Sequence, residues 1–70
     1  MRYRELAKRL RKLGCREIRA GKGSHRIWQN PSTEQVSTIP DWGSKDLAPG
    51  TVRAVLRELG ISRREFGSIQ

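Results

Sequence analysis

The sequence predicts a two-layer α+β sandwich with the element order α-β-β-β-α. Two segments, residues 3–13 and 49–59, have apolar residues at the spacing of an amphipathic helix. Residues 16–39, which lie between them, contain three short strand-like segments separated by turn-forming residues. Two helices with one apolar stripe each need a shared apolar surface, and one face of a three-stranded antiparallel sheet supplies it.

The first helix is predicted over residues 3–13, where apolar residues at positions 3, 6, 7, 10 and 13 form one stripe. Gly14 follows at a position where helix ends favour a residue that tolerates the left-handed conformation. Cys15 can then fold back onto the last turn, and we expect it to be a small core residue.

The first and third strands are predicted on either side of a central strand in an antiparallel meander. Residues 16–20 alternate so that Ile18 faces one side, which predicts a short half-buried strand. Residues 35–39 are rich in β-branched side chains and end at Pro40, after a strong turn signal at residues 30–33.

The second strand is predicted over residues 24–29, after a tight connection at residues 21–23. His25 shares one face of this strand with Ile27, and Arg26 shares the other face with Trp28. Because each face has one large apolar residue, the pattern leaves open which of the two is buried.

The second helix is predicted over residues 49–59, with Pro49 at its first position and Gly60 after its end. Residues 62–65 fit a capping box that begins a short helical turn at about residues 63–67. Five leucine and valine side chains should lie between the helices and the sheet: Leu6, Leu10, Val55, Leu56 and Leu59.

The 70 residues make one small domain with an apolar fraction of 34% and a net charge of +8. The positive excess lies at one end, because residues 1–26 hold ten cations against two acids, whereas residues 27–70 hold five of each sign. A basic field of this kind attracts polyanions, of which nucleic acid is the commonest and membrane headgroups the second. The other interpretation is a solubilising surface.

Several classes of protein are not expected from this sequence. The single cysteine cannot form an intrachain disulfide, and no apolar run resembles a membrane span or a signal peptide, so we expect a cytoplasmic protein without a membrane partner. One histidine, one cysteine and scattered acids are too few for a protein-only metal site. We therefore expect neither a metal nor another cofactor.

His25 is the candidate catalytic residue, since it is the only histidine and it follows two glycines. Histidine is the side chain that can accept and donate protons near neutral pH, and a glycine turn lets backbone approach a ligand closely. The alternative is a structural or ordinary surface histidine, which is the common role of a lone histidine.

The whole chain resembles the HicA family of mRNA interferase toxins, which are small proteins with a fold like that of double-stranded-RNA-binding domains. The resemblance lies in Gly23-Ser24-His25 after a basic first helix and in a strand that ends at Ile39-Pro40. It also lies in the run from Leu47 to Val52, in Leu59-Gly60-Ile61 and in Glu65-Phe66.

The resemblance implies a toxin of a type II toxin–antitoxin system, with His25 as the catalytic residue and a HicB-type antitoxin as the protein partner. Many members have a second histidine after the proline that matches Pro40. This chain has Asp41 and Trp42 there, so a mechanism with two histidines is excluded.

Metal-independent RNA cleavage needs only proton transfer and charge stabilisation, because a 2′-hydroxyl attacks the adjacent phosphorus. His25 would act as general base or acid, and the group for the second proton transfer is left open. The residues expected to bind RNA are Lys22, Gly23, Ser24, Arg26, Arg4 and Lys8. Two alternatives remain: a non-catalytic RNA-binding module of the same fold, and a basic adaptor that binds an acidic protein.

Overall fold

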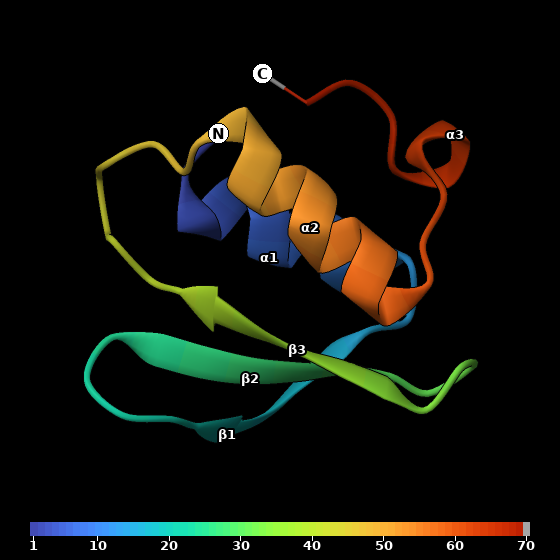
Figure 1. The fold of residues 1–70 in the computed structure, drawn as a ribbon, viewed down its shortest axis with the longest axis horizontal. Helices are drawn as coiled ribbons and strands as arrows, with labels where there is room; N and C mark the ends of the chain where they lie inside the picture. The colour runs from blue at the N-terminus through green and yellow to red at the C-terminus, as the bar shows by residue number, and fades with distance from the viewer. Residues whose placement is uncertain (70) are drawn as a thin grey trace.

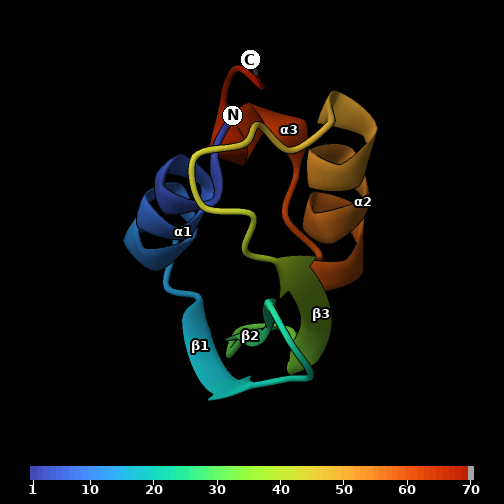
Figure 2. The same ribbon diagram turned by 90° about the vertical axis from the view of Figure 1, so that its left-hand side faces the viewer.

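The computed structural model describes residues 1–69, and Gln70 of the predicted 1–70 domain lies outside the described residues. The two long helices lie side by side on one face of a three-stranded antiparallel sheet with the strand order β1-β2-β3 (Figures 1 and 2). The predicted two-layer α+β architecture is therefore confirmed. The elements are α1 (Tyr3–Lys12), β1 (Arg16–Ala20), β2 (His25–Asn30), β3 (Gln35–Pro40), α2 (Pro49–Leu59) and α3 (Arg63–Phe66).

The hydrophobic core lies between the two helices and the sheet. Figure 2 shows α1 above the β1 side of the sheet and α2 above the β3 side. The five side chains predicted for this layer are at most 2% exposed: Leu6, Leu10, Val55, Leu56 and Leu59. Within residues 1–69, no helix is both long enough and apolar enough to cross a membrane.

Both long helices end at a glycine in a left-handed conformation, as predicted. α1 ends one residue earlier than expected, and Gly14 then has a φ of +91° while the N–H of Cys15 donates to the carbonyl of Leu10 at 2.9 Å. After α2, Gly60 has a φ of +72°, and the N–H of Ile61 donates to the carbonyl of Leu56 at 2.9 Å. Each of these two bonds satisfies a carbonyl at a helix end and turns an apolar residue back to the core.

Strand β1 is more exposed than the sequence predicts. All five of its residues are exposed, and Ile18 retains 43% of its accessible surface. The register explains this, since Glu17 pairs with Trp28 and Arg19 pairs with the preceding residue, Ile27. Ile18 is thus the extra residue of a β-bulge, which disrupts the alternation of faces. The prediction from alternation that this strand is half-buried is therefore wrong.

Strand β2 buries the face that contains Trp28. Trp28 is 0% exposed, and its neighbours across the β2–β3 ladder, Ser37 and Ile39, are 3% and 0% exposed. Trp28 and Arg26 therefore point toward the helices, and His25 and Ile27 lie on the outer face of the sheet. This settles the question that the sequence pattern left open.

Candidate functional site

The β1–β2 turn holds His25 at the first position of β2. The N–H of Gly21 donates to the carbonyl of His25 at 2.8 Å, and the N–H of His25 donates to the carbonyl of Lys22 at 3.1 Å. A Cβ on Gly21 would lie 3.4 Å from the Cβ of His25, so the turn passes close to the histidine. The side chain of His25 is exposed on the outer face of the sheet. The backbone of the candidate catalytic residue is thus fixed while its imidazole meets solvent.

The loop between β3 and α2 lies beside this turn. Pro40, the last residue of β3, pairs with His25, and the N–H of Asp41 donates to the carbonyl of Ser24 at 2.8 Å. Figure 1 shows the β1–β2 turn and this loop at the same, left-hand end of the molecule. A ligand at His25 would therefore meet both segments.

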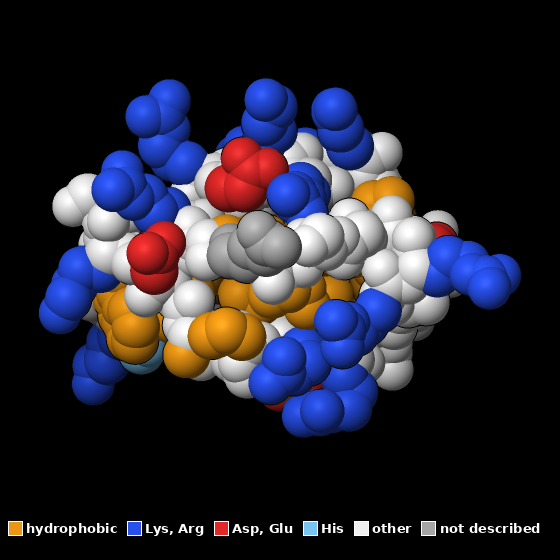
Figure 3. All heavy atoms as spheres, turned by 90° about the horizontal axis from the view of Figure 1, so that it is seen from above, with side chains coloured by type: hydrophobic (Ala, Val, Ile, Leu, Met, Phe, Trp, Pro, Cys, Tyr) orange, Lys and Arg blue, Asp and Glu red, His pale blue; other side chains and the backbone are white. Residues whose placement is uncertain are grey.

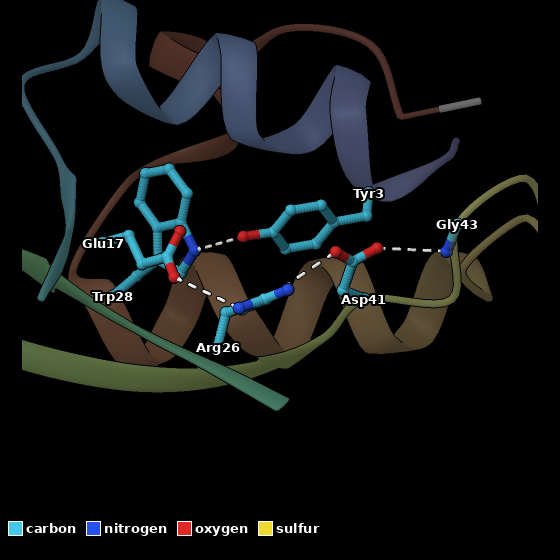
Figure 4. A network of polar contacts seen from close by, with 6 residues as sticks. All are labelled: Tyr3, Glu17, Arg26, Trp28, Asp41 and Gly43. Atoms are coloured by element: carbon cyan, nitrogen blue, oxygen red, sulfur yellow. Dashed lines mark hydrogen bonds and ion pairs between the residues drawn. The ribbon is translucent and has the colours of Figure 1, made fainter. Parts of the chain in front are cut away.

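Arg26 lies on the face of β2 opposite to His25 and points into a network of polar contacts between the sheet and α1 (Figure 4). Its guanidinium lies 3.9 Å from the carboxylate of Glu17 and 3.7 Å from that of Asp41. The other oxygen of Asp41 accepts a hydrogen bond of 3.0 Å from the N–H of Gly43. Two carboxylates thus offset the charge of Arg26, which the structure does not bring together with the imidazole.

The other residues predicted to bind RNA fall into two groups. Lys22, Gly23 and Ser24 are exposed in the turn that precedes His25. Arg4 and Lys8 are exposed on α1, in the other layer, and help to line a shallow hollow. Figure 3 shows Lys and Arg side chains along the rims of the helical face. Only the first group therefore adjoins the histidine.

Part of the basic surface of α1 stabilises the fold. Arg9 donates a hydrogen bond of 2.8 Å to Glu5, one turn away, and its guanidinium lies 5.2 Å from the centre of the Phe66 ring. The guanidinium of Arg11 lies 5.1 Å from the centre of the Trp28 ring. Both distances fall in the range of cation–π interactions. The two arginines therefore cover aromatic core residues and also add positive charge to the surface of α1.

Sequence reasoning missed two features of this end of the molecule. Glu17 and Asp41 were not recognised as partners of Arg26, and Trp42 was treated only as a loop residue although 47% of its surface is exposed. An aromatic residue in a polar, glycine-containing loop was the available signal for Trp42. Among residues 1–69, no group of three or more His, Cys, Asp or Glu side chains could hold a metal ion.

The comparisons with known proteins identify the family. The model of a family described as "HicA toxin of bacterial toxin-antitoxin" matches residues 3–61 of the 70-residue chain. Searches of curated proteins and of solved structures gave no significant match. The matched region extends from α1 through the β1–β2 turn, the sheet and α2 to the buried Ile61. The chain therefore belongs to the HicA toxin family of bacterial toxin–antitoxin systems.

Proposed function

We propose that this HicA-family toxin is an endoribonuclease that cleaves mRNA without a metal ion and uses His25 for proton transfer. The observation that carries this proposal is the position of His25, whose backbone is held by hydrogen bonds on both sides of a glycine turn. Its imidazole is exposed at the end of the domain where exposed backbone and Lys22 can also meet a ligand. A fixed backbone and an accessible imidazole suit a general acid or base.

The proposed reaction is an internal transesterification. The 2′-oxygen of a ribose forms a bond to the adjacent phosphorus as its proton leaves, and the bond from phosphorus to the 5′-oxygen of the next nucleotide breaks. The 5′-oxygen takes up a proton, so the products are a cyclic phosphate and a free 5′-hydroxyl. Neutral His25 can accept the first proton, or its imidazolium can donate the second. Water or another group carries out the remaining transfer.

Charge stabilisation comes from the turn beside His25. Lys22 and the backbone N–H groups around Gly23 are suited to the phosphate, and the hydroxyl of Ser24 can orient substrate or imidazole. Arg4 and Lys8 on α1 extend the attraction for RNA over the domain. We assign Arg26 a supporting role, because its contact with Asp41 holds the β3–α2 loop next to the turn.

The antitoxin partner that the toxin–antitoxin family implies is, in our proposal, a HicB-type protein that covers the basic surface around His25. Carboxylates brought to a cationic site increase the rate and specificity of association. RNA and antitoxin should then compete, and adding antitoxin to a preformed RNA complex should release the RNA. A stable ternary complex with RNA still bound at His25 would contradict this arrangement.

The test of the function compares His25→Ala with wild type in RNA cleavage, RNA affinity and thermal midpoint, with EDTA-treated protein. We expect the cleavage rate to fall by roughly 10²- to 10⁴-fold, while affinity and midpoint stay nearly unchanged. Gln29→Ala is the control, since Gln29 lies on the same face of β2 but at the far end of the strand from the turn.

The same experiment distinguishes the alternatives. RNA binding without cleavage by the wild-type protein would indicate a non-catalytic RNA-binding module. A wild-type protein with no affinity for RNA would indicate a basic adaptor. Cleavage that persists in His25→Ala would move the active site elsewhere, and a His25→Ala protein that does not fold would give His25 a structural role.

A further inference from the structure

Trp42 differs from the other tryptophan of this protein in its exposure. Trp28 is 0% exposed and belongs to the core, whereas Trp42 is 47% exposed and lies outside the core cluster. Single exposed apolar side chains are common on protein surfaces and need no explanation by themselves. Trp42 is distinguished by its position in the fold and by the contacts that hold its loop.

Trp42 lies next to the turn that positions His25. The residue before it, Asp41, donates its N–H to the carbonyl of Ser24 at 2.8 Å, and Pro40 pairs directly with His25. In Figure 3, hydrophobic side chains border the histidine at the left-hand end of the molecule. The exposed large hydrophobic residue of the β3–α2 loop is Trp42. Trp42 thus follows directly after the two residues, Pro40 and Asp41, that pair with His25 and Ser24.

The loop around Trp42 is braced by short contacts. The carboxylate of Asp41 accepts from the N–H of Gly43 at 3.0 Å and lies 3.7 Å from the guanidinium of Arg26 (Figure 4). The carbonyl of Trp42 accepts from the N–H of Lys45 at 3.1 Å. The backbone is therefore held on both sides of the indole. A platform that is already in place costs less entropy when it binds a ligand than a flexible loop does.

The chemistry around the indole suits nucleic acid. Lys22 and Lys45 are exposed on the two segments that meet beside Trp42, so cations for phosphates accompany a ring for stacking. Proteins that bind single strands combine these two elements, and stacking needs a base that is free of a partner strand. We propose that Trp42 stacks on an unpaired nucleobase next to the phosphate that His25 addresses. This inference rests on the proposed RNA cleavage and adds a base-binding residue beside the phosphate that is cleaved.

The experiment uses short single-stranded RNA that contains one abasic nucleotide, moved step by step along the strand. RNA affinity is measured for two proteins, the His25→Ala variant and the same variant with Trp42→Ala added. Both contain His25→Ala so that the RNA is not cleaved during the measurement. Val36→Ala is the control, because Val36 is 50% exposed at the end of the sheet far from the turn. We expect Trp42→Ala to weaken binding of intact RNA by roughly 5- to 100-fold, and Val36→Ala to change it by less than about twofold.

When the abasic nucleotide stands at one particular position of the RNA, the protein that has Trp42 should bind this RNA roughly 5- to 100-fold more weakly than intact RNA. The Trp42→Ala protein should bind the two RNAs almost equally. Trp42→Phe should restore most of the affinity, since phenylalanine also stacks. RNA should also quench tryptophan fluorescence in the protein with Trp42, and should leave the emission of the buried Trp28 unchanged in Trp42→Ala. The thermal midpoint of Trp42→Ala should match that of the parent protein.

Three results would overturn the inference. The first is unchanged RNA affinity in Trp42→Ala, and the second is an abasic penalty that is equal with and without Trp42. The third is a loss of antitoxin affinity without a loss of RNA affinity, which would assign the indole to a protein interface, where tryptophan is also common. Each of these leaves RNA cleavage by His25 standing. Absence of RNA binding by the wild-type protein would instead remove the proposed function and this inference together.

Discussion

The indole N–H of Trp28 on β2 donates a hydrogen bond of 2.9 Å to the hydroxyl of Tyr3 on α1 (Figure 4). The two rings meet edge to face, with centroids 6.5 Å apart and planes at 66°. Both residues are buried, so this bond satisfies the only polar atom of the Trp28 side chain and joins the first helix to the central strand.

We predict that Tyr3→Phe destabilises the protein by about 1 to 3 kcal/mol, because the N–H of Trp28 would remain buried without a partner. Urea unfolding of the two proteins gives this difference directly, and an unchanged m-value would show that both proteins expose the same amount of surface on unfolding. Equal free energies of unfolding would mean that the indole N–H gains another partner or water.

The same pair predicts a loss of stability at alkaline pH. Burial raises the pKa of Tyr3 above its ordinary value of 10.0, and the hydrogen bond from Trp28 opposes part of this rise. A folded-state pKa above the unfolded value favours the neutral phenol in the folded protein, so stability should fall as pH rises through about 10. Tyr3→Phe should reduce this fall in a series of urea titrations between pH 8 and 11.

Cys15 should also contribute to the loss of stability at alkaline pH. Burial also raises the pKa of Cys15 from its ordinary value of 9.0, which adds a loss of stability in the same direction. Both proteins in the comparison contain Cys15, so the difference between their pH profiles isolates Tyr3. Parallel profiles above pH 10 would show that the phenol has the same pKa in the folded and unfolded states.

Gly60 is predicted to be intolerant of a side chain for two reasons. Its φ of +72° is left-handed, and a Cβ there would lie 2.7 Å from Oε1 of Gln35 and 3.0 Å from Cγ2 of Thr33. The glutamine end can move. Thr33 is held, since its hydroxyl donates to the carbonyl of Leu59 at 3.2 Å and accepts from the N–H of Gln35 at 3.2 Å. Gly60→Ala should therefore cost more than the roughly 1 to 2 kcal/mol of the left-handed conformation alone.

The steric part of this cost can be separated from the backbone part. Thr33→Ser keeps the hydroxyl and its hydrogen bonds but removes the methyl group that an alanine at position 60 would meet. The free energy of unfolding lost in Gly60→Ala should therefore be smaller when Thr33→Ser is already present. Identical losses in both backgrounds would attribute the whole effect to backbone conformation.

RNA affinity should fall as salt rises, by about 0.7 log units per log unit of salt for each single-strand phosphate contacted. Lys22→Ala should reduce this slope by about 0.7, because its charge faces solvent beside the candidate site. Arg26→Gln should change the slope much less, since Glu17 and Asp41 already offset that charge. Fluorescence anisotropy with labelled RNA measures the slopes, and equal effects of both substitutions would argue that Arg26 also contacts phosphate.

The helices and their ends could be predicted because their signals are local. A stripe repeated every three to four residues and a glycine after it depend only on neighbours in sequence, so the leucines of the core and the turns at Gly14 and Gly60 were found. The candidate catalytic residue was found in the same way, from two glycines before the only histidine. The family model matches residues 3–61, a range that includes this histidine.

The tertiary structure decided which face of β2 is buried, and with it the surroundings of each site residue. Alternation alone made Ile27 and Trp28 equivalent, but only Trp28 meets the hydroxyl of Tyr3 and the apolar side chains of both helices. Its burial turns His25 to the outer face and Arg26 inward to Glu17 and Asp41, which come from other segments. Contacts between segments distant in sequence leave no periodic signal, so the sequence determined where the histidine lies in the chain and only packing determined what it faces.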